Sequence, residues 1–180
     1  MQRICILGCS GGGKSTFANS LAKATGLPLI HLDREYWRPG WQLPSSAEWR
    51  TQHQALIARP AWIIDGNYSS TADERLARAD TIVLFDRPRW LCFWRIAKRV
   101  ATSWGKVRAD MAPGCPEQFD WEFLVYVWQF KAKHQPRLEA AMARFAPGRQ
   151  LVIARSDRDL DAFLADARSI QNSESSASHA

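Results

Sequence analysis

A glycine-rich run near the start of the chain combines residue types that bind phosphate. It reads Gly8-Cys9-Ser10-Gly11-Gly12-Gly13-Lys14-Ser15, with Thr16 directly after it. The spacing fits G-x-x-x-x-G-K-[ST], in which glycines let successive backbone N–H groups turn inward around phosphates. Lys14 can reach the β- and γ-phosphates, and the Ser15 hydroxyl can ligate Mg²⁺. The run therefore predicts a cradle for ATP or GTP, formed by Gly8, Ser10, Gly11, Gly12, Gly13, Lys14, Ser15 and Thr16.

A turn that merely joins a strand to a helix is the alternative interpretation of this run. The apolar residues 3–8 before it are typical of a strand buried on both faces of a parallel sheet. The apolar residues after it have helical spacing until Gly26. A helix N-terminus adds the positive end of its dipole to a phosphate site. The complete motif in this strand–turn–helix context favours phosphate binding.

Two aspartates that end apolar runs are candidates for the metal side of such a site. Asp65 ends the run 62–65, and Asp86 follows the run 81–85. We favour Asp65, because Gly66-Asn67-Tyr68 after it places a flexible turn at the edge where ligands bind. Asp86 is interpreted as a strand-end turn or a helix cap. Ser15 and Asp65 are thus the predicted Mg²⁺ residues.

Asp33 follows a third apolar run, at 29–32. Ligands of parallel sheets bind outside the carboxyl ends of the strands, so a carboxylate there can orient an acceptor hydroxyl or take its proton. A helix cap or an ordinary loop carboxylate explains the position equally well. His31, two residues earlier, is either a core residue or a site residue.

A basic segment around residues 87–117 is the candidate for a lid. Arg95 and Arg99 are four residues apart and share one face of a helix that Pro88 can begin. The glycines and prolines of 104–117 predict a mobile loop. Two guanidinium groups beside such a loop suit a lid, at about 95–117, that closes over a transferring phosphoryl group. A solvated basic face is the alternative.

Strand-like and helix-like segments alternate along the chain, which predicts an α/β fold of three layers with a parallel five-stranded sheet and helices on both faces. We expect one domain over 1–170 and a disordered Ser-rich tail over 171–180. The expected strands are 3–8, 29–32, 62–65, 81–85 and 151–154. The expected helices are 15–24, 47–59, 71–79, 88–99, 118–145 with a break at Pro136, and 160–170, and the expected loops are 34–46 and 104–117.

Composition narrows the class of protein. The net charge of +6 and the pI near 9.5 favour polyanionic partners, which include nucleotides and nucleic acid. The four cysteines form no C-x-x-C pair, so we expect free thiols in a reducing cytosol rather than a zinc site. The N-terminal apolar run is too short for a signal peptide, and no stretch is long enough to span a bilayer. We therefore expect a cytoplasmic protein without a membrane partner.

Six sequence signatures carry a resemblance to a known family. They are GCSGGGKST at 8–16, HLD at 31–33, WRPGW at 37–41, WIIDGNYSST at 62–71, DRPRWLCFWR at 86–95 and APGCPE at 112–117. Over about 1–165 the sequence resembles the bacterial P-loop group labelled DNA topology modulation (FlaR-like) proteins, which are adenylate-kinase-like. The resemblance implies the nucleoside and shikimate kinase branch, the strand order 2-3-1-4-5, use of ATP with Mg²⁺, and contact of Asp33 with the acceptor.

The chain departs from adenylate kinases at one informative place. Those enzymes carry Asp-Gly-Phe-Pro-Arg where this chain has Asp-Gly-Asn-Tyr-Ser at 65–69, so the arginine that grips AMP is missing. The first hypothesis is a phosphotransferase that moves the γ-phosphoryl of Mg-ATP to a small acceptor, either a nucleotide or a hydroxylated metabolite. Its catalytic residues would be Lys14, Asp33, Arg95 and Arg99.

Two other function classes remain open on the sequence. The alternative is a nucleotide-dependent protein that binds DNA and regulates its topology, which the positive charge and the family label allow. The absence of a helix-turn-helix signature and the concentration of basic residues near the lid count against it. A plain ATPase is the third class, and the lack of a glutamate directly after Asp65 disfavours it.

Overall fold

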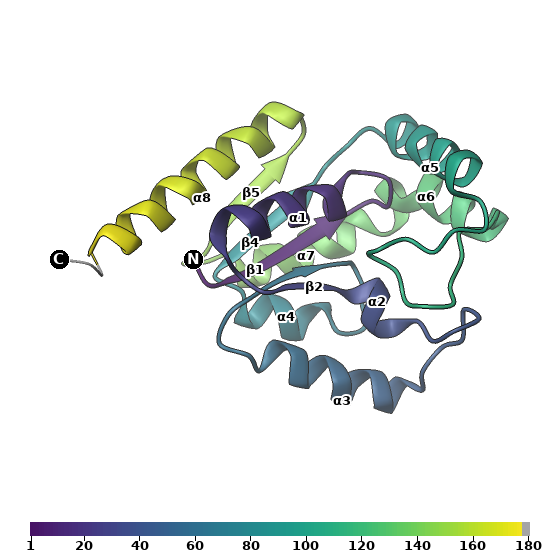
Figure 1. Ribbon diagram of the computed structural model, residues 1–180, viewed down its shortest axis with the longest axis horizontal. Helices are drawn as coiled ribbons and strands as arrows, with labels where there is room; N and C mark the ends of the chain where they lie inside the picture. Colours follow the sequence, from purple (N-terminus) through teal and green to yellow (C-terminus); the bar gives the residue numbers. More distant parts are fainter. Residues whose placement is uncertain (178–180) are drawn as a thin grey trace.

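The computed structural model describes residues 1–177, with side chains through residue 169. In this part of the chain five strands form one parallel sheet in the order β2-β3-β1-β4-β5, as predicted (Figure 1). The strands are β1 (Arg3–Gly8), β2 (Leu29–His31), β3 (Trp62–Asp65), β4 (Thr81–Phe85) and β5 (Gln150–Ala154).

Helices cover both faces of the sheet and bury its side chains in two separate cores. On one face, α1 (Lys14–Thr25) packs against α8 (Asp157–Ala177), and Phe17 of α1 contacts both Phe85 and Phe163. The other core is shared by the helices α3 (Ser46–Ile57), α4 (Ala72–Arg78), α5 (Arg89–Ser103), α6 (Trp121–Lys133) and α7 (Gln135–Phe145). The sheet thus forms the middle of three layers, and the loop after β1 lies at its carboxyl edge.

Capping residues and prolines in the sequence explain where several helices begin. Ser45 caps α3 and forms a capping box with Glu48, whose side chain returns a bond to the Ser45 backbone. The helix expected over 118–145 is broken at His134 into α6 and α7, with Pro136 in the first turn of α7. Proline fits there because the first helical N–H groups have no partner within the helix.

Two expectations for helix positions are wrong. The second strand ends at His31, and Leu32 begins a short helix, α2 (Leu32–Tyr36), inside the expected loop 34–46. Acidic residues at the start of this segment favour helix, and the first proline comes only at Pro39. The helix expected over 160–170 runs from Asp157 to Ala177, without a glycine or proline, and so enters the segment 171–180 of the expected tail. Residues 178–180 of that tail lie outside the described residues.

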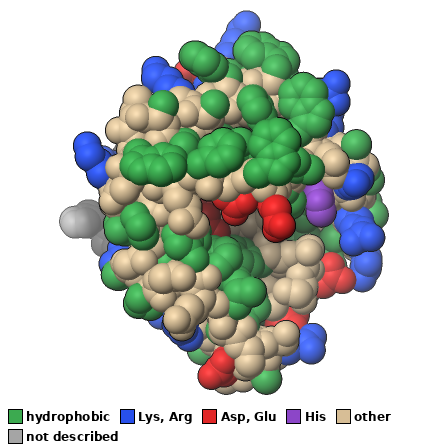
Figure 2. Space-filling model, turned by 90° about the vertical axis from the view of Figure 1, so that its right-hand side faces the viewer, with side chains coloured by type: hydrophobic (Ala, Val, Ile, Leu, Met, Phe, Trp, Pro, Cys, Tyr) green, Lys and Arg blue, Asp and Glu red, His purple; other side chains and the backbone are tan. Residues whose placement is uncertain are grey.

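The tryptophans divide into two groups. Those before residue 63 are buried or half-buried, whereas Trp90, Trp94, Trp104, Trp121 and Trp128 are between 45% and 66% exposed. Figure 2 shows hydrophobic side chains gathered over the end of the molecule where α5 and α6 lie, above a hollow with acidic side chains. In α6 the buried residues are Leu124, Val127 and Phe130, which form one stripe of the helix. None of the helices in the described residues is both long and apolar enough to cross a membrane.

Candidate functional site

The phosphate-binding motif forms a tight loop between β1 and α1. Gly8, Gly11 and Gly13 all have positive φ angles, of 129°, 80° and 100°. A Cβ atom on Gly8 would lie 2.5 Å from the Phe85 carbonyl oxygen, and one on Gly11 would lie 2.3 Å from that of Cys92. The loop is therefore wedged between β4 and α5 with no room for side chains, which fixes its backbone at the N-terminus of α1.

Lys14 is the buried cation of this loop. Its ammonium donates hydrogen bonds to the carbonyl oxygens of Gly8, at 2.8 Å, and Cys9, at 3.0 Å. The side chain thus folds back over the loop, where a bound phosphate can supply stronger acceptors for the same three donors.

The turn after β3 clamps the start of the cradle. The Asn67 side-chain oxygen accepts from the Gly8 N–H at 3.0 Å, and its amide donates to the Gly8 carbonyl at 2.9 Å. Arg75 is fully buried and donates to the carbonyl oxygens of Gly66 and Asn67. The sequence predicts a flexible turn here, but Arg75 holds its backbone and Asn67 ties it to β1. Arg75 lies ten residues beyond Asp65, where nothing in the local pattern links it to the turn.

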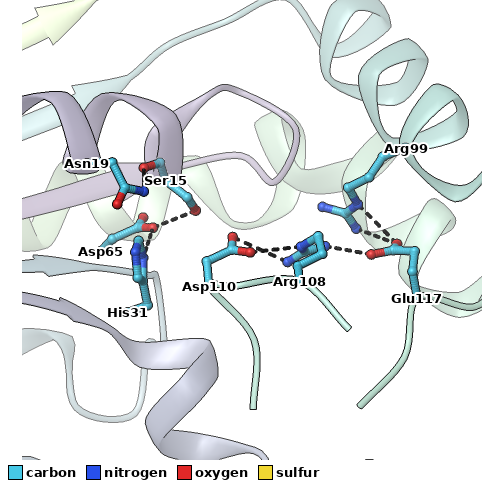
Figure 3. A network of polar contacts seen from close by, with 8 residues as sticks. All are labelled: Ser15, Asn19, His31, Asp65, Arg99, Arg108, Asp110 and Glu117. Atoms are coloured by element: carbon cyan, nitrogen blue, oxygen red, sulfur yellow. Dashed lines mark hydrogen bonds and ion pairs between the residues drawn. The ribbon is translucent and has the colours of Figure 1, made fainter. Parts of the chain in front are cut away.

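The predicted metal residues are in direct contact. The Ser15 hydroxyl donates to Asp65 Oδ2 at 2.7 Å, and His31 Nδ1 lies 3.1 Å from the same oxygen (Figure 3). The second oxygen, Asp65 Oδ1, is buried and has no hydrogen-bond partner among the described residues. An unpaired buried carboxylate oxygen beside a serine hydroxyl fits a hard cation such as Mg²⁺ or one of its water ligands. The rival, Asp86, instead pairs with Lys131 and Arg155.

His31 belongs to this site rather than to the core. Burial alone would lower its pKa, but the hydrogen bond and the charge of Asp65 outweigh burial, so the pKa is raised. The charges of Asp110 and Asp33 act in the same direction. His31 therefore fixes the orientation of Asp65 from the side opposite Ser15.

Asp33 lies in the first turn of α2, just beyond the end of β2. Its Oδ1 accepts a hydrogen bond of 2.8 Å from the Tyr68 hydroxyl. Burial raises the pKa of Asp33, and the Tyr68 hydrogen bond offsets part of that rise. The Tyr68 ring packs against Tyr36 and Trp49, with ring centres 4.5 and 5.3 Å apart, so the hydroxyl is held in place.

The arginines of the predicted lid contact the cradle and take part in a chain of ion pairs. Arg95 donates to the Gly12 carbonyl at 3.2 Å, so it touches the cradle directly. Arg99 donates to Glu117, whose second oxygen accepts from Arg108 at 2.7 Å (Figure 3). Arg108 also binds Asp110 at 2.9 Å.

Arg108 and its two carboxylate partners are site residues that sequence reasoning did not single out. Burial alone would raise the pKa of Asp110. The hydrogen bond and the charge of Arg108, with a smaller contribution from Ser15, outweigh the effect of burial, so the pKa of Asp110 is lowered. Arg108 and Asp110 line the same cleft as Ser15, so the loop that follows α5 faces the cradle. Arg108 lies within a run of basic residues, and Glu117 ends the Gly-Pro-rich APGCPE motif. The sequence therefore indicates the segment to which each belongs, but not that the two side chains form an ion pair.

One cleft brings the candidate residues together. Its volume is about 1430 Å³, above the usual range of roughly 300–1,000 Å³ for a small-ligand site, which leaves room for a nucleotide and a second molecule. Of the predicted residues, Gly8 and Gly12 support the loop without lining the cleft. The cleft is lined by Ser10, Gly11, Gly13, Lys14, Ser15, Thr16, Asp33, Asp65, Arg95 and Arg99, and also by Trp37, Trp41, Tyr126, Arg108, Asp110 and Arg137.

A comparison with family models identifies the family of this chain through the part that contains the cradle. A family model described as AAA domain (AAA_28) matches residues 3–93, just over half of the chain. The chain belongs to this family of P-loop domains. The matched part of the domain contains the cradle, Asp33 and Asp65, but ends before Arg95. No curated protein matches the sequence.

Solved structures show the fold of the domain. A shikimate kinase from Acinetobacter baumannii in complex with shikimate is 18% identical, with 98% of this chain and 94% of that one covered, and has a TM-score of 0.56. A shikimate kinase from Bacteroides thetaiotaomicron is 16% identical, with 95% and 98% covered, and has a TM-score of 0.50. At these identities the likeness establishes that the P-loop domain has the fold of these kinases.

Proposed function

We propose that this P-loop protein is an ATP-dependent phosphotransferase that moves the γ-phosphoryl group of Mg-ATP to a hydroxyl group of a small acceptor. The single observation that carries the proposal is one cleft lined both by Lys14, Ser15 and Asp65 and by Asp33. The first three are the residue types that hold a triphosphate and its metal, and Asp33 is a base of the type that an acceptor hydroxyl needs. The kinase fold of the solved neighbours supports the same reaction class.

The donor half of the reaction would rest on the cradle. Backbone N–H groups of the loop and the ammonium of Lys14 would hold the β- and γ-phosphates. Ser15 and Asp65 would hold Mg²⁺ directly or through water. When bound, this ion supplies positive charge beside the phosphate oxygens. Arg95, Arg99 and Arg108 would neutralise the charge that develops on the transferring group, since all three line the cleft.

The acceptor half would rest on Asp33. Burial moves the pKa of Asp33 upward, toward neutral pH. A carboxylate with a higher pKa is a stronger base, which suits a group that takes a proton from a hydroxyl. Among the described residues Asp33 is hydrogen-bonded to the Tyr68 hydroxyl rather than paired with a cation, so a phosphate placed against this carboxylate would be repelled. A neutral hydroxyl group is therefore favoured over a nucleoside monophosphate. The Tyr68 hydroxyl that binds Asp33 lies in the segment where adenylate kinases carry their AMP-gripping arginine.

A panel of acceptors tests the proposal. The protein is incubated with Mg-ATP and, in turn, nucleoside monophosphates, nucleosides and cyclic alcohols that resemble shikimate, and products are identified by mass spectrometry. We expect a phosphorylated alcohol, and the Asp33→Asn variant should bind ATP normally but yield about 10²–10⁴-fold less product. Slow hydrolysis of ATP with every acceptor would contradict the phosphotransferase assignment.

The exposed tryptophans favour a second candidate function, nucleotide-dependent binding of DNA as in a FlaR-like regulator. The Arg89 guanidinium stacks 4.5 Å from the ring centre of Trp128, and Trp90, Trp94 and Trp121 are more than 60% exposed. Exposed aromatic rings beside cations are a platform for single-stranded bases. Binding to a single-stranded oligonucleotide, weaker at higher salt and altered by Mg-ATP, would support this function. Binding that is independent of ATP would separate the surface from the nucleotide site and count against it.

A further inference from the structure

Two sequence motifs that the proposed reaction does not use meet in space. The first is a turn at 38–42, where Arg38 and Gln42 form two backbone hydrogen bonds of 3.0 and 3.3 Å around Pro39-Gly40. The second is the segment 111–117 in the loop after α5, here called the lid tip. About seventy residues separate them. The turn follows α2, which carries Asp33, whereas the lid tip follows Arg108 and Asp110.

Three polar contacts join the turn to the lid tip. The Gly40 N–H donates to the Gly114 carbonyl at 2.9 Å, and the Trp41 indole N–H donates to the Pro116 carbonyl at 3.2 Å. The Cys115 thiol donates to the Arg38 carbonyl at 3.1 Å. Two of the donors belong to the turn and one to the lid tip, so each segment satisfies polar groups of the other.

A small apolar core lies beside these contacts. Met111, Ala112 and Cys115 are buried and pack against Trp37 and Trp41. The rings of the two tryptophans lie edge to face, with centres 5.2 Å apart. This core is separate from the two cores of the sheet, so the junction contributes its own burial of apolar surface.

Gly114 is the closest point of approach. Its φ angle is 76°, and a Cβ atom there would lie 2.9 Å from Pro39 Cβ. Gly105, at the other end of the same loop, has nearly the same φ angle of 70° but nothing within 4 Å of its Cβ position. Both glycines therefore adopt the left-handed backbone conformation, but only Gly114 is in close contact with Pro39.

The lid tip is continuous with the residues that face the cradle. The Glu117 N–H donates to the Lys106 carbonyl and the Gly105 N–H to the Glu117 carbonyl, both at 2.9 Å, which closes the loop at its base. The Met111 N–H donates to the Arg108 carbonyl at 3.1 Å, so the backbone of Arg108 is bonded to the lid tip itself.

We propose that the turn 38–42 and the lid tip 111–117 form a clasp that positions Arg108 and Asp110 over the cradle. Trp41 of the turn and Trp37 beside it pack against the lid tip and also line the cleft, so an acceptor that packs against them acts on the same unit that carries Arg108. The lid and the acceptor wall then open and close together. Trp41 and Gly114 are positioning residues in this scheme, and their role in catalysis rests on the proposed phosphotransferase function.

Hydrogen exchange of the full chain tests the clasp without any activity. In Gly114→Ala, which alters only the lid side, amides of 38–42 and of 111–117 should both exchange roughly tenfold faster, which corresponds to about 1.4 kcal/mol of opening. Gly105→Ala is the matched control and should leave 38–42 unchanged. Faster exchange in 111–117 alone, or the same change in both variants, would overturn the clasp.

A second measurement addresses coupling to the site. Mg²⁺ with a non-hydrolysable ATP analogue should slow exchange at 38–42 in the wild-type protein, although the turn is far in sequence from the cradle. In Trp41→Phe, which keeps most of the ring but loses the bond to Pro116, this slowing should be at least halved while the analogue still binds. Undiminished slowing would overturn the coupling. If the analogue does not bind the wild type, the proposed function fails, whereas the clasp is judged by the first measurement.

Discussion

The cradle and the lid are built in opposite ways. The cradle is a short loop whose shape comes from its own glycines and from close backbone contacts with β4 and α5. The lid is a long loop whose shape comes from side chains, namely the chain of ion pairs from Arg99 through Glu117 to Arg108 and the clasp to residues 38–42. One region is fixed before any ligand arrives, and the other is held by contacts that a ligand can compete for.

This difference indicates how the two halves of the site would work. A pre-formed ring of backbone N–H groups binds phosphate without reorganisation. Arg99 and Arg108 already have a carboxylate partner in Glu117, so binding of an anionic phosphoryl group would exchange one acceptor for another and desolvate no new cation. The cradle would supply affinity for phosphate, and the lid would supply contacts that form as the site closes.

Loss of Lys14 should have the largest effect. Lys14→Ala removes the only side-chain cation of the motif, so we expect turnover of ATP to fall by about 10²–10³-fold, the usual cost of removing one preorganised charge. Steady-state ADP formation measures it. Lys23→Ala, in the last turn of the same helix, is the control and should keep full turnover. A Lys14→Ala protein with unchanged turnover would remove this lysine from the mechanism.

The cradle should not tolerate a single methyl group. Gly11→Ala places a Cβ against the Cys92 carbonyl and forces alanine to a φ of 80°, whereas Gly26→Ala meets the same conformational demand, at 71°, in open space. The control should lose about 1–2 kcal/mol of unfolding free energy, from the left-handed conformation alone. Gly11→Ala should lose about 1–3 kcal/mol more, from overpacking. Urea denaturation measures both, and equal losses would mean that the loop adjusts freely.

The same contrast explains what the sequence could predict. The strand, the glycine spacing and the helix of the cradle are local, and the apolar runs before Asp65 and Asp33 placed both carboxylates at the correct edge of the sheet. The partners of Tyr68 and Asn67 could not be found in this way, because each contact joins segments far apart in the chain. A buried arginine such as Arg75 looks like any basic residue of a surface helix until the turn above it is seen.

Loss of the Glu117 charge should affect the lid and leave the cradle intact. Glu117→Gln removes the buried carboxylate that two partly buried guanidiniums share and weakens their hydrogen bonds, so we expect a loss of about 1–3 kcal/mol in the stability of this loop. Hydrogen exchange should rise in 104–117 and stay constant in 8–15. Glu122→Gln, an exposed residue of α6, is the control for loss of one charge. A rise in both regions would show that the two halves are not independent.

Removal of the Tyr68 hydroxyl should give the smallest effect, confined to the acid side of the pH profile. If Asp33 must be ionised to take a proton, activity rises with pH as Asp33 loses its proton, which gives the profile an acid limb. Burial raises the pKa of Asp33, so this limb lies at a higher pH than for an ordinary carboxyl group. The Tyr68 hydrogen bond lowers this pKa, so Tyr68→Phe should move the limb to still higher pH and leave the alkaline plateau unchanged. The profile of kcat/KM measures the shift. Tyr36→Phe, in the same aromatic cluster, is the control and should leave the limb in place. A limb that stays fixed or moves to lower pH in Tyr68→Phe would mean that another group than Asp33 sets it.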